Sequence, residues 1–203
     1  MRRPASAFVA VLVSILALPC ARAEPPRFDL ETERVLYCVG YAHLDTQWRW
    51  DYPTTIDRFI RKTLDDNFAL FEAHPEYVFN FTGSVRYEMM REYYPERYER
   101  LKGYVGTGRW LVSGSSVDAG DANVPSPESM LRQLLYGNLY FQREFARESV
   151  DFMLPDCFGF PASMPSIWPP AGRLGCSTQK LPSGSPVGPS RAVSLISIVV
   201  LIS

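Results

Sequence analysis

Short apolar runs alternate along this chain with longer segments in which apolar residues recur every three or four positions. The runs 35–41, 77–82, 110–113 and 151–154, and a possible fifth at 176–178, have the length and composition of strands. The longer segments have the spacing of helices that bury one face. The order strand, helix, strand, helix predicts an α/β fold with a mainly parallel sheet and helices packed outside it.

Proline and capping residues set the bounds of the predicted helices. A helix spans 53–71, and a helical stretch over 84–105 is interrupted at Pro95, because proline cannot continue a helix interior. A third helix spans 126–145, with a serine cap followed by proline. The residues expected on the buried helix faces are Ile56, Phe59, Ile60, Leu64, Phe68, Phe71, Met130, Leu134, Phe141 and Phe145.

The first 23 residues have the pattern of a secretory signal, with two arginines, an apolar run over 7–18 and a small-x-small site ending at Ala23. We expect cleavage near Ala23 and export to the periplasm or the outside. The apolar run is too short for a stable membrane anchor. Cleavage removes three of the 21 basic residues and none of the 22 acidic ones, leaving a net charge near −4. This mild acidity argues against nucleic acid as a partner.

Three cysteines remain after that cleavage, namely Cys38, Cys157 and Cys176. Their odd number predicts no complete disulfide framework. We interpret Cys38 as a small buried residue of the first strand, because free cysteine behaves as a core hydrophobe.

His43 and Asp45 follow the first predicted strand. In extended backbone, residues two apart point to the same side, so an imidazole and a carboxylate are aimed at one point. That pair makes half of a zinc site, and Trp48 offers a flat apolar face on which a sugar can stack. The alternative is a strand-end histidine that simply bonds a nearby aspartate, since isolated motifs often arise by chance.

Distant residues should meet at one edge of the predicted sheet. His43, Asp45, Asp156 and the loop 114–123 all come just after predicted strands, and ligands of parallel α/β folds lie at the carboxyl ends of strands. We therefore expect them to converge on one rim. Three ligand types brought together in this way are a stronger signal than the first pair alone.

Several of these residues also have plainer interpretations. Asp156 follows a proline and could form a turn. Asp118 and Asp121 could orient substrate hydroxyls or the groups around the ligands, or they could simply belong to a solvated loop. His74 lies at a predicted helix end with no motif around it. A favourable interaction with the helix dipole accounts for it.

The segment Gly40 to Asp45, GYAHLD, followed by WRW at 48–50, resembles the metal-binding signature of the family 38 glycoside hydrolases, the retaining α-mannosidases. Similar segments continue in order between 35 and 188. They are VDAGDANVPSPES at 117–129, LRQLLYG at 131–137, LPDCFGF at 154–160 and STQKL at 177–181.

This resemblance implies the N-terminal part of a (β/α)7 barrel, incomplete at its C-terminus. It also implies one zinc ion held by His43, Asp45 and Asp156, with Asp156 as the nucleophile and Trp48 at the mannose subsite. We expect Asp121 to bind substrate as well. The implied reaction is retaining hydrolysis of terminal α-mannosides in glycans. A neighbouring divalent cation would keep Asp156 ionised where burial favours the neutral acid.

Family members are several times longer than this chain, and the resemblance places a second zinc-binding histidine and the general acid/base in the part not matched. We expect a signal peptide at 1–23, a partial catalytic domain at 24–188 and a disordered, aliphatic tail at 189–203. The resulting hypothesis is a chain descended from an α-mannosidase, of marginal stability and without a complete active site.

Two other functions remain open. One is a different metal-dependent polysaccharide hydrolase or deacetylase. Its zinc site would need histidines beyond His43, and the sequence has only one other, His74. A non-catalytic carbohydrate-binding fragment would hold sugar through Trp48 and Trp50. Mixed histidine and carboxylate ligands also suit manganese or cobalt, and the sequence leaves the oligomeric state unknown.

Overall fold

The computed structural model describes residues 38–167 and 175–178, together with the single residues 29, 32, 169 and 172. The chain divides into two units, 1–35 and 36–203, and the elements below all belong to the second. The predicted signal sequence and the aliphatic tail lie outside the described residues. In the part of the chain that is described, no helix combines the length and apolar character needed to cross a membrane.

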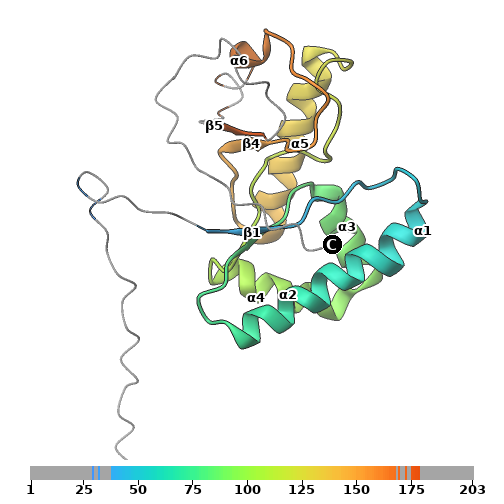
Figure 1. The fold of residues 1–203 in the computed structure, drawn as a ribbon, viewed down its shortest axis with the longest axis vertical. Helices are drawn as coiled ribbons and strands as arrows, with labels where there is room; N and C mark the ends of the chain where they lie inside the picture. The colour runs from blue at the N-terminus through green and yellow to red at the C-terminus, as the bar shows by residue number, and fades with distance from the viewer. Residues whose placement is uncertain are drawn as a thin grey trace, which may run out of the picture. The chain divides into compact units, whose positions relative to one another are not determined.

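Two small parallel sheets hold the described strands. The first sheet contains β1 (Gly40–Tyr41), β2 (Phe79–Asn80) and β3 (Trp110–Leu111) in that order, and the second pairs β4 (Asp151–Met153) with β5 (Gly175–Ser177) (Figure 1). The predicted α/β class with parallel strands is confirmed. Over the described residues these strands do not close into a barrel, so the barrel stays a prediction.

Polar side chains connect the first sheet to the second, because the described strands β3 and β4 share no backbone hydrogen-bond ladder. Ser113 Oγ donates to Asp151 Oδ2 at 2.6 Å, and the Gly114 amide donates to Ser149 Oγ at 3.0 Å. Gly114 has φ +109°, and a Cβ there would lie 2.6 Å from Thr82 Cγ2, so only glycine permits this approach. The same Cβ position lies 3.3 Å from Met153 Cβ, so the residues at the carboxyl ends of β2, β3 and β4 come together beside Gly114.

The helices begin and end close to where proline and serine predict. They are α1 (Tyr52–Thr54), the π-helical η1 (Thr55–Ile60), α2 (Arg61–Ala73), α3 (Ser84–Tyr93), α4 (Pro95–Gly106), α5 (Pro127–Phe145) and α6 (Met164–Ile167). The predicted break at Pro95 separates α3 from α4. Ser126 caps α5, since its hydroxyl accepts the amide of Ser129 at 3.2 Å.

The core consists of two apolar clusters. The larger lies around Trp110, which is 1% exposed and packs against Phe79 with ring centroids 4.8 Å apart. The smaller joins Met130 and Leu134 of α5 to Phe152 of β4. All of the predicted helix-face residues are buried except Phe59 and Phe145, which are partly buried.

The interpretation of Cys38 as a buried strand residue is wrong. Cys38 is exposed, and β1 begins two residues later at Gly40. The apolar run 35–41 correctly predicts a strand. Among its described residues, Gly40 and Tyr41 are the ones that pair with β2.

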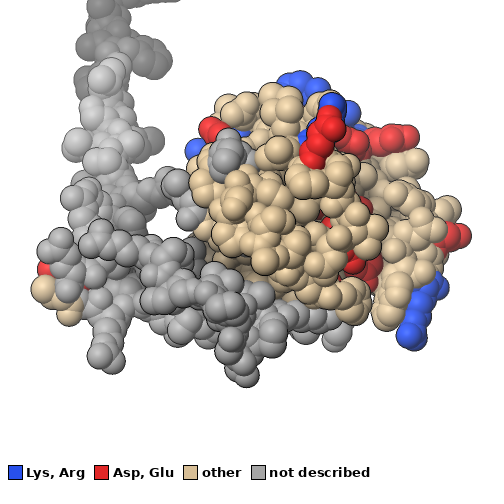
Figure 2. Space-filling model, turned by 90° about the horizontal axis from the view of Figure 1, so that it is seen from above, with Lys and Arg blue, Asp and Glu red and all other residues tan. Residues whose placement is uncertain are grey.

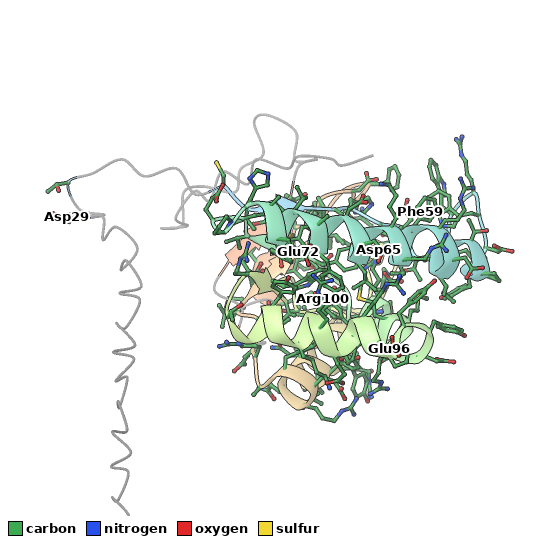
Figure 3. The ribbon with its side chains drawn as sticks, turned by 90° about the horizontal axis from the view of Figure 1, so that it is seen from below. Asp29, Phe59, Asp65, Glu72, Glu96 and Arg100 are labelled. Carbon is green, nitrogen blue, oxygen red and sulfur yellow. The ribbon has the colours of Figure 1, made fainter. Side chains whose placement is uncertain are left out.

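Surface ion pairs cross between α2 and α4, which lie side by side in Figure 3. Arg97 Nε lies 2.8 Å from Asp65 Oδ1, and Arg100 pairs with Glu72. All four side chains are well exposed, so these pairs contribute little to stability. Figure 2 shows a face on which charged side chains are few and of both signs.

Candidate active site

Three predicted ligands from distant parts of the chain meet in the structure. His43 and Asp45 follow β1, and Asp156 follows β4. His43 Nε2 lies 3.3 Å from Asp45 Oδ1 and 3.6 Å from Asp156 Oδ2. The imidazole is 18% exposed, while the carboxylates are 37% and 38% exposed, so an ion or a sugar can reach the carboxylate oxygens from solvent.

These distances allow a test of whether zinc fits. Zinc bonds nitrogen and oxygen at about 2.0–2.2 Å, which in a tetrahedral site separates neighbouring ligand atoms by roughly 3.3–3.6 Å. The two distances from His43 Nε2 match that separation. Even so, no group of three or more His, Cys, Asp and Glu in the described part of the chain is arranged to hold a metal ion. The two distances from His43 thus suit zinc, but the three side chains together are not arranged as a metal site.

A buried arginine holds the backbone between the first two ligands. Arg86 of α3 is 1% exposed, and its guanidinium donates to the carbonyl of Leu44 and, at 2.9 Å, to that of Thr82. It also donates to Asp118 Oδ1 at 2.9 Å. Arg86 was not predicted as a functional residue; its signal in the sequence is a charged residue among the buried positions of an amphipathic helix.

Asp118 binds neighbouring segments as well as its own loop, whereas Asp121 binds only loop amides among the contacts that the described residues make. Asp118 Oδ1 accepts Thr46 Oγ1 at 2.9 Å and the Ala119 amide at 2.7 Å, besides Arg86. Asp121 is exposed, and its Oδ1 accepts the backbone amides of residues 123 and 124 at 2.6 and 3.0 Å. The contacts of Asp121 follow the turn-forming interpretation, whereas those of Asp118 with Thr46 and Arg86 follow the interpretation in which it orients groups around the ligands. A role of Asp121 in sugar binding stays a prediction.

The two tryptophans of the motif differ in their surroundings. Trp48 is 64% exposed, with the guanidinium of Arg49 over its ring at 4.4 Å from the centroid. Trp50 is half-buried, donates from Nε1 to Thr55 Oγ1 at 2.9 Å and packs against Phe59. Trp48 therefore offers an accessible face to a ligand, and Trp50 fixes the chain leading into η1.

His74 lies where the sequence predicts, at the end of α2. Its backbone amide donates to Leu70 O at 2.9 Å, and its exposed imidazole lies 3.7 Å from Glu76 Oε1. His74 precedes β2, whereas His43 follows β1, and these strands are parallel. The two histidines consequently lie at opposite ends of the strands, His43 at the carboxyl ends and His74 at the amino ends.

Comparison with known proteins decides the family. Residues 33–183 match the N-terminal domain of the family 38 glycosyl hydrolases. The chain belongs to this family. Alpha-mannosidase G of Dictyostelium discoideum is 34% identical over 151 residues, which cover 74% of this chain and 14% of that protein. Human alpha-mannosidase 2C1 is 32% identical over 167 residues, covering 80% of this chain and 16% of that protein.

The fold of this family 38 chain also has a solved counterpart. An alpha-mannosidase from Enterococcus faecalis V583 superposes with a TM-score of 0.64 at 25% identity, over 70% of this chain and 16% of that one. The family 38 chain thus spans 14–16% of the length of these relatives. The resemblance drawn from the motifs is confirmed.

Proposed function

We propose that this chain supplies part of the active site of a zinc-dependent retaining α-mannosidase. The observation that carries the proposal is the approach of His43 Nε2 to carboxylate oxygens of Asp45 and Asp156 at 3.3 and 3.6 Å. It occurs in a family 38 chain whose curated relatives are alpha-mannosidases. The substrate class is a terminal α-mannoside of a glycan.

His43, Asp45 and Asp156 would hold the zinc ion through one nitrogen and carboxylate oxygens. When bound, zinc supplies positive charge that favours ionised carboxylates and attracts sugar hydroxyls. An ionised Asp156 attacks the anomeric carbon and forms a glycosyl ester as the leaving oxygen departs, and water later hydrolyses that ester. Trp48 presents its open face to the sugar ring.

We also propose that this chain alone does not complete the reaction. A retaining glycosidase needs a second carboxylic acid about 5–5.5 Å from the nucleophile to protonate the leaving oxygen. Asp118 is engaged with Arg86, and Asp121 binds backbone amides, which leaves neither well suited to that role. His74 lies at the amino ends of the strands, opposite to His43, so it cannot serve as a further zinc ligand.

The first experiment is calorimetric titration of the purified 203-residue chain with zinc. We expect one bound ion, with binding abolished by His43→Ala and unaffected by the matched control His74→Ala. Equal zinc affinity of these two variants would refute the proposed ligand set.

The second experiment measures hydrolysis of 4-nitrophenyl α-mannoside in the presence of zinc. We expect no rate above that of the His43→Ala, Asp156→Asn double variant. A higher rate in the unmodified chain would show that it carries its own acid/base group, and would leave the zinc proposal standing.

The exposure of Trp48 favours one alternative function, a carbohydrate-binding fragment without chemistry. The two functions differ in their dependence on metal. Mannose binding that persists in a chelator but is lost in Trp48→Ala would support the binding fragment. Mannose binding that requires zinc would support the glycosidase subsite.

A further inference from the structure

Arg86 is the buried charge that the proposed chemistry does not use. Its side chain is 2% exposed, and its guanidinium reaches chain segments that follow three different strands. It donates to Leu44 O after β1, to Thr82 O after β2 and to Asp118 Oδ1 after β3. A buried guanidinium is costly unless its N–H groups meet acceptors, and these three acceptors serve Nη1 and Nη2, whereas the buried Nε has no hydrogen-bond partner among the described residues.

Gly83 makes room for this arrangement. A Cβ at Gly83 would lie 1.9 Å from Arg86 Nη1, and the residue has φ +84°. Any other residue there would both strain the backbone and displace the guanidinium. The turn after β2 is thus shaped around Arg86.

Asp118 anchors the other side of the pair. Its carboxylate accepts Thr46 Oγ1 as well as Arg86, and its own amide donates to Gln133 Oε1 of α5 at 3.1 Å. The loop carrying Asp118 is therefore fixed to a long helix. Through Thr46 and Leu44, that rigid support extends to the segment containing the two predicted ligands.

We propose that the Arg86–Asp118 pair is a positioning device for the metal-binding segment 43–45. Leu44 lies between His43 and Asp45, so fixing its carbonyl restricts the directions in which both flanking side chains leave the backbone. Thr46, held by Asp118, fixes the other end of the segment. This role rests on the proposed zinc site, and neither Arg86 nor Asp118 touches the metal or the substrate.

The test compares zinc affinity among variants of the full chain by competitive titration. Arg86→Lys keeps the charge but loses the forked geometry, and we expect it to weaken zinc binding 10- to 100-fold. The matched control is Arg91→Lys on the same helix, whose guanidinium is 48% exposed and pairs with Glu144 of α5 instead of Asp118. We expect Arg91→Lys to bind zinc as the unmodified chain does.

A milder variant guards against loss of folding. Thr46→Val removes only the hydroxyl that Asp118 accepts, and we expect a chain that still unfolds cooperatively but binds zinc several-fold more weakly. The visible spectrum of the cobalt-loaded chain adds a readout of ligand geometry, which a purely structural role would leave unchanged. In both Arg86→Lys and Thr46→Val we expect the cobalt bands to shift.

The outcomes separate the two proposals. If the unmodified chain binds no zinc, the proposed function fails and the positioning role fails with it. If the unmodified chain binds zinc, and folded Arg86→Lys and Thr46→Val bind it equally well with the same cobalt spectrum, only the positioning role is overturned.

Discussion

Gly137 of α5 is the position where a single methyl group should disturb the loop behind the candidate site. A Cβ at this glycine would lie 2.2 Å from the carbonyl oxygen of Ser115 and 2.5 Å from the carbonyl carbon of Ser116. Both obstacles are backbone atoms, which cannot swing aside as a flexible side chain does. The same loop continues to Asp118, so its displacement is felt at segment 43–45.

The magnitude follows from comparison with Gly103 of α4. A Cβ at Gly103 meets no heavy atom within 4 Å, so Gly103→Ala should gain the helix propensity of alanine, roughly 0.5–1 kcal/mol. Gly137→Ala gains the same propensity, but the loop must retreat by about 0.8 Å to restore a 3.0 Å contact. Overpacking of this kind costs about 1–3 kcal/mol. Because the propensity cancels, that cost is the expected difference between the variants.

Urea denaturation followed by circular dichroism measures both variants under one condition. We expect Gly103→Ala to raise the free energy of unfolding and Gly137→Ala to lie about 1–3 kcal/mol below it. Gly137→Ala should also weaken zinc binding, since its loop carries Asp118. If Gly137→Ala is as stable as Gly103→Ala, the close approach of α5 to the loop is wrong.

Three further predictions concern other parts of the molecule. Iodoacetamide at pH 8 should alkylate exposed Cys38 much faster than Cys176, because burial raises the pKa of the Cys176 thiol to about 12; peptide mass spectrometry would detect the opposite order. Burial also raises the pKa of Tyr77 and Tyr140 to about 12, so the folded state holds these protons more tightly than the unfolded chain. The stability that these two tyrosines contribute is complete below pH 10 and is lost as the pH rises towards 12. The urea midpoint should therefore fall over that range, and a constant midpoint would contradict the burial of the two hydroxyls. Ser126→Ala should lower the free energy of unfolding by about 1 kcal/mol, since it removes the cap of α5, and an unchanged urea midpoint would show that the cap contributes nothing.

Local patterns in the sequence determined most of the elements. Pro95 and Ser126 set helix boundaries because proline lacks an amide hydrogen and serine satisfies one at a helix start, and both effects act within one turn. The spacing of His43 and Asp45 likewise depends on a few residues of extended chain. The rule that ligands follow parallel strands correctly brought Asp156 to them.

Tertiary structure alone decided which residues are exposed and which partners each buried polar group contacts. Cys38 is exposed although it belongs to an apolar run, because the paired residues among those described in this run are Gly40 and Tyr41. Arg86 finds its carboxylate partner on a loop 32 residues later, and no periodicity records that pairing. Hydrophobic spacing reports which face of an element is buried, whereas the acceptors of a buried charge depend on how separate elements pack. The sequence therefore determined the candidate ligands, and packing decided how they are held.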